Sequence, residues 1–169
     1  MISLTRGVPA PESYALEDFA VCFSKAMIED GAKACAYNAS PGYAPLIESI
    51  AELYQVQTEQ VLLGNGSLEL FYFMTMSELQ KGDKVLVEAP SYDRTNLLLK
   101  RRGTIPVEVR MEADGVDLNA FEDAVKEHSP KLFYCIPDFQ NPMGSTMSYA
   151  KRKAVGELAE KYNFKIIED

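Results

Sequence analysis

Helical periodicity is the first pattern along the chain. Apolar residues three and four positions apart, with polar residues between them, predict amphipathic helices. A Pro-rich extended opening precedes the first helix, and Asp30-Gly31 is expected to end it. The helix that follows Ser67 is apolar on every side, which predicts burial on all sides. The expected helices cover residues 16–29, 46–54, 68–79, 92–101, 118–125 and 154–162.

Short apolar runs lie between most of these helices and predict strands. The expected strands are residues 61–64, 84–89, 104–110, 131–136 and 164–169. Strands that alternate with helices predict a mainly parallel sheet covered on both faces. The fold class is therefore α/β, a three-layer α/β/α arrangement.

Unusual stretches follow four of the expected strands, and ligands bind at the carboxyl ends of such strands. They are GNGS (64–67), EAPSY (88–92), PDFQNPMG (137–144) and ED (168–169). The first predicts either a phosphate cup or a plain turn capped by Ser67. Tyr92 either stacks on a ligand ring or packs within the protein. Asn141 either donates to a ligand oxygen or only shapes a turn.

Asp169 ends an expected buried strand, where a carboxylate is costly unless it is paired. A protonated ring nitrogen of a cofactor would relieve that cost, and so would an arginine. The side chain therefore predicts a cationic partner at the same edge of the sheet.

Charge and cysteine content limit the partners and the kinds of site that the chain is expected to have. The 169 residues carry 25 acids against 17 bases, a net charge of −8, which argues against nucleic acid and anionic membranes as partners. The start lacks the features of a signal peptide, and no apolar run approaches the ~20 residues of a membrane span. Cys22, Cys35 and Cys135 are scattered and the chain has one histidine, so no metal site or disulfide is expected. The three cysteines are interpreted as reduced, mostly buried thiols of a cytoplasmic protein.

Seven stretches in order resemble the fold type I pyridoxal-phosphate enzymes, class I/II aminotransferases. They are GVPAPESY (7–14), YNASPGYAPLIESIAELY (37–54), GNGSLEL (64–70), KGDKVLVEAPSY (81–92), DGVDLNAFED (114–123), PDFQNPMGSTMSYAKR (137–152) and FKIIED (164–169). The opening is most similar to the branch that holds aminoadipate and aromatic aminotransferases and the aminotransferase-like domains of MocR-type regulators. Two departures are Leu46-Ile47, where the family usually has Leu-Arg, and Met143, where it has threonine.

The resemblance implies a role for each residue at the strand ends. A carboxylate on the ring nitrogen would keep it protonated, so that the ring withdraws electrons from the substrate Cα. By this resemblance, Gly66, Ser67 and Leu68 would contact the cofactor phosphate, and Tyr92 would stack on the ring face. Asn141 would bind the phenolic oxygen and Asp169 the ring nitrogen. Tyr37 would contact the phosphate bound by a dimer partner, and Gly7 the substrate carboxylate.

The same resemblance implies a longer parent chain. Residues 1–36 would be an N-terminal segment with its helix, and 37–169 an incomplete large domain that stops before the Schiff-base lysine. Two further strands are expected between the strand that ends near Gly64 and the one that begins near Lys131, so a piece without them exposes sheet edges. Lys25, in CFSK, looks like the family's lysine motif, but it lies on an amphipathic helix and is expected to be solvated.

The function expected from the resemblance is that of a fragment of a pyridoxal-phosphate-dependent aminotransferase. The parent, expected to be a cytoplasmic homodimer, would transfer an amino group between an amino acid and a 2-oxo acid, and the 169 residues alone are predicted to be inactive. One alternative is the effector domain of a MocR-type regulator, disfavoured because no basic winged-helix domain precedes Met1. A lyase or decarboxylase on the same fold is another alternative. A nucleotide-binding domain is a third, without the usual glycine fingerprint.

Overall fold

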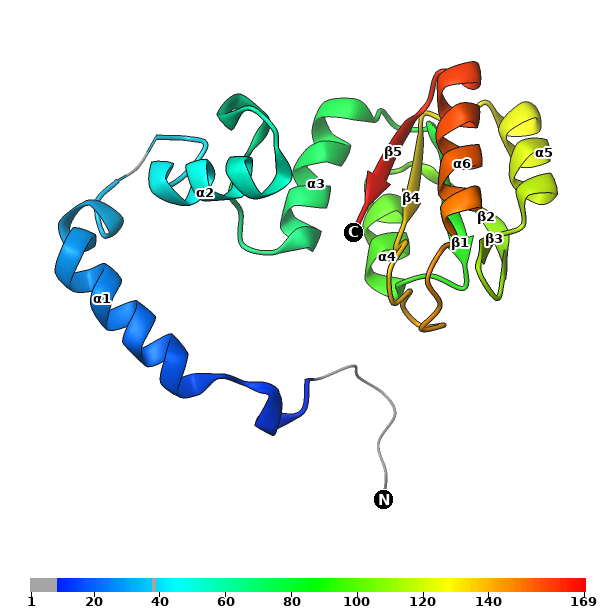
Figure 1. The fold of residues 1–169 in the computed structure, drawn as a ribbon. Coiled ribbons are helices and arrows are strands. Elements are labelled where there is room, and N and C mark those ends of the chain that lie inside the picture. The colour runs from blue at the N-terminus through cyan, green and yellow to red at the C-terminus, as the bar shows by residue number, and fades with distance from the viewer. Residues whose placement is uncertain (1–8, 38) are drawn as a thin grey trace. The chain divides into compact units, whose positions relative to one another are not determined.

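The computed structural model describes residues 9–37 and 39–169 of the chain (Figure 1). These residues form two compact units, of which one ends at Leu63 and the other runs from Gly64 to Asp169. Gly7, the expected substrate contact, lies outside the described residues.

Helices form the first unit, and their bounds differ in part from the periodicity. The elements are the 3₁₀ turn η1 (Pro11–Ser13), α1 (Leu16–Ala34), α2 (Ala44–Tyr54) and the 3₁₀ turn η2 (Thr58–Gln60). The predicted stop at Asp30-Gly31 is a local break instead, because Asp30 has non-helical dihedrals (φ −141°, ψ 18°) and the helix resumes after it. Asp30 accepts a hydrogen bond from the Tyr43 hydroxyl, which ties the break to the start of α2.

The predicted strand at 61–64 is wrong. These residues are irregular, and the Leu63 N–H donates to the carbonyl of Pro41 (2.9 Å) instead of to a neighbouring strand. A four-residue apolar run does not distinguish a strand from a loop that covers its own unit with its side chains.

The second unit contains the sheet. Its elements are α3 (Ser67–Glu78), β1 (Lys84–Ala89), α4 (Asp93–Arg101), β2 (Ile105–Glu112), β3 (Gly115–Val116), α5 (Leu118–His128), β4 (Leu132–Cys135), α6 (Tyr149–Tyr162) and β5 (Lys165–Glu168). The strand order is β3-β2-β1-β4-β5, and β1, β2, β4 and β5 are parallel. The sequence did not indicate β3, which pairs antiparallel with the end of β2.

Helices cover both faces of this sheet, which confirms the three-layer α/β prediction (Figure 1). Because alternate strand residues point to opposite faces, Val85 and Val87 pack with Phe71 of α3 and Leu99 of α4 on one side. Leu86, between them, packs on the other side. That second core also contains Phe121 and Val125 of α5, Phe133 of β4, and Val155 and Ala159 of α6.

The prediction that α3 is buried all round is wrong. Only Phe71 and Thr75 of this helix are buried, since a single stripe of it meets the sheet. The large side chains on its other sides are exposed, namely Leu68, Tyr72, Phe73, Met74 and Met76.

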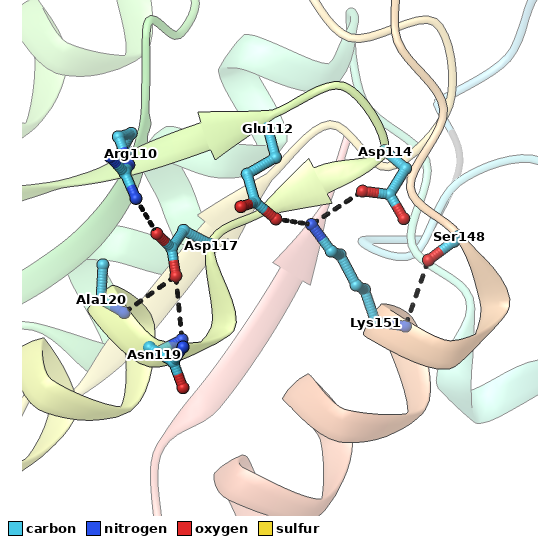
Figure 2. Close-up of polar contacts among 8 residues, drawn as sticks. All are labelled: Arg110, Glu112, Asp114, Asp117, Asn119, Ala120, Ser148 and Lys151. Atoms are coloured by element: carbon cyan, nitrogen blue, oxygen red, sulfur yellow. Dashed lines mark hydrogen bonds and ion pairs between the residues drawn. The ribbon is translucent and has the colours of Figure 1, made fainter.

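Ion pairs attach the β2–β3 hairpin to the two helices that follow it (Figure 2). Asp117 accepts from the backbone N–H groups of Asn119 (3.0 Å) and Ala120 (3.2 Å) at the start of α5, and it pairs with Arg110 of β2. Lys151 of α6 donates to Glu112 of β2 (2.6 Å) and also contacts Asp114 in the turn before β3 (2.8 Å).

Two expectations about exposure and edges need correction. Cys22 and Cys35 are exposed, and Cys135 is buried, so most of the free thiols are not buried. The strand that begins near Lys131, β4, already pairs with β1 on one side and β5 on the other. No further strand can pair with β4, and among the described residues β5 is the strand with an open edge on that side of the sheet.

Candidate functional site

Three of the four unusual stretches follow neighbouring parallel strands. Val87 of β1 is level with Tyr134 of β4, and Tyr134 is level with Ile167 of β5. The carboxyl ends of parallel strands meet at the same edge of a sheet. The segments that carry Tyr92, Asn141 and Asp169 therefore start from one edge.

The fourth stretch forms the start of α3 without a preceding strand. Gly66 precedes the helix with φ 104° and ψ 160°, a conformation that L side chains rarely adopt. Ser67 is the first helical residue and its side chain makes no cap, so its predicted capping role is wrong. Glu69 instead turns back and accepts from the Asn65 N–H (2.7 Å). The remaining N–H groups of the first turn have no acceptor within the helix, which makes them available to an anion.

Asp169 is exposed, contrary to the expectation of burial, and it has a partner that the sequence did not indicate. The Tyr134 hydroxyl donates to its Oδ2 (2.6 Å), and the Asp169 N–H donates to the carbonyl of Cys135 (3.0 Å). Tyr134 is fully buried, and its ring lies 4.9 Å from that of Phe71, one turn into α3. Burial, together with the bond to Asp169, raises the pKa of Tyr134, so the hydroxyl remains a donor.

Gln140, next to Asn141, is buried and joins the loop after β4 to the loop after β1. Its Nε2 donates to Glu88 Oε2 (2.9 Å) and to the Pro90 carbonyl (2.9 Å), while its Oε1 accepts from the Met143 N–H (2.9 Å). The Gln140 N–H donates to the carbonyl of Ser145 (2.8 Å). The Asn141 loop is thus shaped by its neighbour, and Asn141 itself is exposed.

Glu88 is a buried acid at the end of β1, 1% exposed. Its Oε2 also accepts from the Ile136 N–H (3.2 Å), and its Oε1 has no partner among the residues that the structure describes. Burial raises the pKa of Glu88, and the bonds from Gln140 and Ile136 lower it by less. A carboxyl group that is buried away from water and has one unpaired oxygen is costly to ionise.

Helix α6 holds the far end of the same loop. Arg152 donates to the carbonyls of Met147 (3.1 Å) and Pro137 (3.1 Å) and pairs with Asp138 (2.6 Å). Residues 137 and 147 are themselves joined by a backbone bond of 2.7 Å. Lys151 attaches the same helix to the β2–β3 hairpin (Figure 2).

The remaining expected residues are less constrained. Tyr92 is half-buried and immediately precedes α4. Tyr37 belongs to the other unit and is fully exposed there, and Lys25 is an exposed residue of α1.

Two hollows lie near this part of the second unit. One, of about 480 Å³, is lined by Leu68 and Tyr72 of α3 and by residues of α4. The other, of about 560 Å³, is lined by Glu88, Ser91 and Asn96 among others. Neither hollow contains Asn141 or Asp169.

The sequence carried a clear signal for only one of the three residues that were missed. Glu88 stands inside the apolar run KVLVEA, and a buried charge needs a partner. Gln140 is a polar residue that follows another expected strand, but nothing in the sequence shows that the two strands are neighbours. Tyr134 is two residues before the end of the expected strand 131–136, but the sequence does not show that this strand lies beside the one that ends at Asp169.

The family model for aminotransferase class I and II matches residues 4–169. The chain belongs to this family. A 2-aminoadipate transaminase of Thermus thermophilus is 32% identical to it over the whole chain, which corresponds to 43% of that relative's length. An uncharacterized HTH-type transcriptional regulator of Escherichia coli is 26% identical over the whole of this chain, which corresponds to 37% of the regulator's length.

The solved structures of the class I and II family include a strong match to the fold. The α-aminoadipate aminotransferase LysN of Thermus thermophilus, solved in complex with N-(5'-phosphopyridoxyl)-L-leucine, has a TM-score of 0.89 and 33% identity, covering 97% of this chain and 42% of that one. The chain therefore spans less than half the length of these relatives. No helix in the described part of the chain is long and apolar enough to cross a membrane.

Proposed function

We propose that the protein is a pyridoxal-phosphate-dependent aminotransferase, which transfers an amino group between an amino acid and a 2-oxo acid. The observation that carries the proposal is the family match over residues 4–169, together with a carboxylate held at the end of β5 by a buried tyrosine. When bound, pyridoxal phosphate withdraws electrons from the substrate Cα, and a carboxylate beside its ring nitrogen supports this by keeping the nitrogen protonated.

The residues of the second unit fit the chemical groups of this cofactor. The free N–H groups at the start of α3, with Gly66 beside Ser67 and Leu68, suit a phosphate. An exposed amide at Asn141 suits the phenolic oxygen, and the half-buried Tyr92 suits the ring face. The Tyr134 hydroxyl holds Oδ2 of Asp169, and the other oxygen of this carboxylate would bind the ring nitrogen.

Further parts of the proposal lie outside the second unit. Tyr37 would reach the phosphate of a dimer partner, and Gly7 would contact the substrate carboxylate. The cofactor-binding domain would begin at residue 37. The protein would act as a cytoplasmic homodimer on small molecules, with neither nucleic acid nor membrane as a partner.

Cofactor binding and turnover test this function. We expect the protein at its natural length to develop a visible absorption band with pyridoxal phosphate and to convert amino donors in the presence of 2-oxo acids. Asp169→Ala should remove turnover and weaken cofactor binding by about tenfold or more, because an ionic partner of the ring is lost. The 169-residue chain alone should not transaminate. Turnover by Asp169→Ala at the wild-type rate would contradict the proposal.

An effector domain of a transcriptional regulator is the second candidate, favoured by the identity to the Escherichia coli regulator. Both candidates predict cofactor binding, so turnover separates them. A protein that binds pyridoxal phosphate, accepts no amino donor and carries a DNA-binding domain would support the regulator.

A further inference from the structure

A buried pair connects the end of β1 to the loop after β4, namely Glu88 and Gln140. The two residues are 52 positions apart in the chain, and each is 1% exposed. Gln140 Nε2 lies 2.9 Å from Glu88 Oε2 and 2.9 Å from the Pro90 carbonyl. The pair therefore crosses from one strand end to the next.

Each polar atom of the Gln140 side chain has a hydrogen-bond partner within the protein. Its two amide hydrogens serve Glu88 and Pro90, and its oxygen accepts from the Met143 N–H (2.9 Å). Glu88 Oε2 is shared with the Ile136 N–H (3.2 Å). Any displacement of one loop against the other would break a buried hydrogen bond, which is expensive.

The connected backbone lies next to two of the proposed cofactor contacts. Pro90 is two residues before Tyr92, and Gln140 directly precedes Asn141. We propose that Gln140 and Glu88 are positioning residues that fix the spacing between Tyr92 and Asn141, and so hold the ring face and the phenolic oxygen of the cofactor in one geometry. This inference rests on the proposed function and extends it to two residues that do not touch the cofactor.

A purely structural pair would stabilise the fold without affecting the cofactor. A positioning pair changes how the ring is held, so its loss changes cofactor affinity and the absorption band of the bound cofactor at equal fold stability. These two readouts separate the alternatives without relying on activity.

The test measures the dissociation constant of pyridoxal phosphate and the position of its absorption band in the purified protein at its natural length. Gln140→Ala and Glu88→Ala should each weaken binding by about tenfold and shift the band, because the loops that carry Tyr92 and Asn141 are no longer held at one spacing. The double variant should bind no more than about twofold worse than the weaker single variant, since the two residues act through one connection.

Two further variants serve as controls. Val125→Ala removes a buried methyl pair from α5 on the other face of the sheet, so it should lower fold stability and leave the dissociation constant unchanged. Glu88→Gln retains an oxygen for the Ile136 N–H and for Gln140, and should recover most of the affinity lost in Glu88→Ala. If Gln140→Ala does not fold, Gln140→Met keeps the side-chain length and carries the same expectation.

Each outcome decides the matter. Weaker binding, a shifted band and a non-additive double variant support the positioning role. Wild-type affinity and an unshifted band in folded Gln140 variants, or strictly additive losses, overturn it while the proposed function stands. A wild-type protein that does not bind pyridoxal phosphate overturns the proposed function, and this inference with it.

Discussion

At the scale of single residues, the side chains that hold the candidate site differ from those expected to touch a ligand. Asp169 and Asn141 are exposed, and Tyr134 and Gln140 beside them are buried. Tyr134 donates a 2.6 Å hydrogen bond to Asp169, and Gln140 fixes the loop of Asn141 through its bonds to Glu88, Pro90 and Met143. The positions of the exposed residues therefore depend on buried partners.

Tyr134→Phe tests the support of Asp169. We expect pyridoxal phosphate to bind about tenfold more weakly, because a hydrogen bond from a buried hydroxyl to a carboxylate is lost. Fluorescence titration of the protein at its natural length measures the change. Tyr162→Phe is the matched control, since its hydroxyl donates to Glu122 (3.0 Å) on the opposite face of the sheet. Equal affinities in the two variants would refute a role for Tyr134.

Glu88→Gln tests the cost of the buried acid. Because burial raises the pKa of Glu88 above 4.5, the folded state binds more protons than the unfolded state just above that pH. Wild-type stability should therefore fall relative to the variant as the pH rises from about 4.5 through the raised pKa. Urea denaturation of both proteins at about pH 4.5 and about pH 8 measures this difference. The same difference at both pH values would show that Glu88 does not titrate in this window.

At the scale of elements, attachments between helices and loops decide the geometry. Periodicity predicted most helices and strands of the second unit, because amphipathic patterns in alternating order leave few arrangements. It did not predict β3 or the strand order, which depend on pairings between distant segments. Periodicity also overstated the burial of α3, because an apolar side chain such as Met76 does not show by itself whether another element covers it.

Lys151→Met tests the attachment of α6 to the β2–β3 hairpin. The variant keeps the buried stem of the side chain and loses the contacts to Glu112 and Asp114. We expect a loss of about 1 kcal/mol in the free energy of unfolding, with a weaker dependence on salt than in the wild type. Lys153→Met is the control on the same helix, because its pair with Glu157 is exposed and 3.8 Å long. A Lys151 effect no larger than that of Lys153 would contradict the attachment.

At the scale of the whole molecule, the two units differ in how much of their surface is buried. Strands β1 and β4 lie in the middle of the sheet, and their side chains are largely buried. Helix α1 has Gly31 as its one buried residue in the described chain. The resemblance seen in the sequence covered both units, but it could not show this contrast.

Hydrogen exchange of the 169-residue chain tests the contrast. Amides of 84–89 and 132–135 should exchange most slowly, because opening them breaks both cores of the sheet. Amides of α1 should exchange among the fastest of the helices. Mass spectrometry of peptides at a series of exchange times measures the order. Protection of α1 equal to that of β1 would mean that the first unit is stabilised by contacts beyond those described.

The strand order gives the sheet two dissimilar borders. Along β2, Pro106 has no N–H to offer, Glu108 and Arg110 carry charge, and β3 already occupies the far end. Along β5, Lys165 and Glu168 also carry charge, but this edge has no proline and no further strand of the described chain pairs with it. A further strand can therefore pair with β5 more readily than with β2. The sheet can be extended at the β5 edge, next to the carboxylate of Asp169.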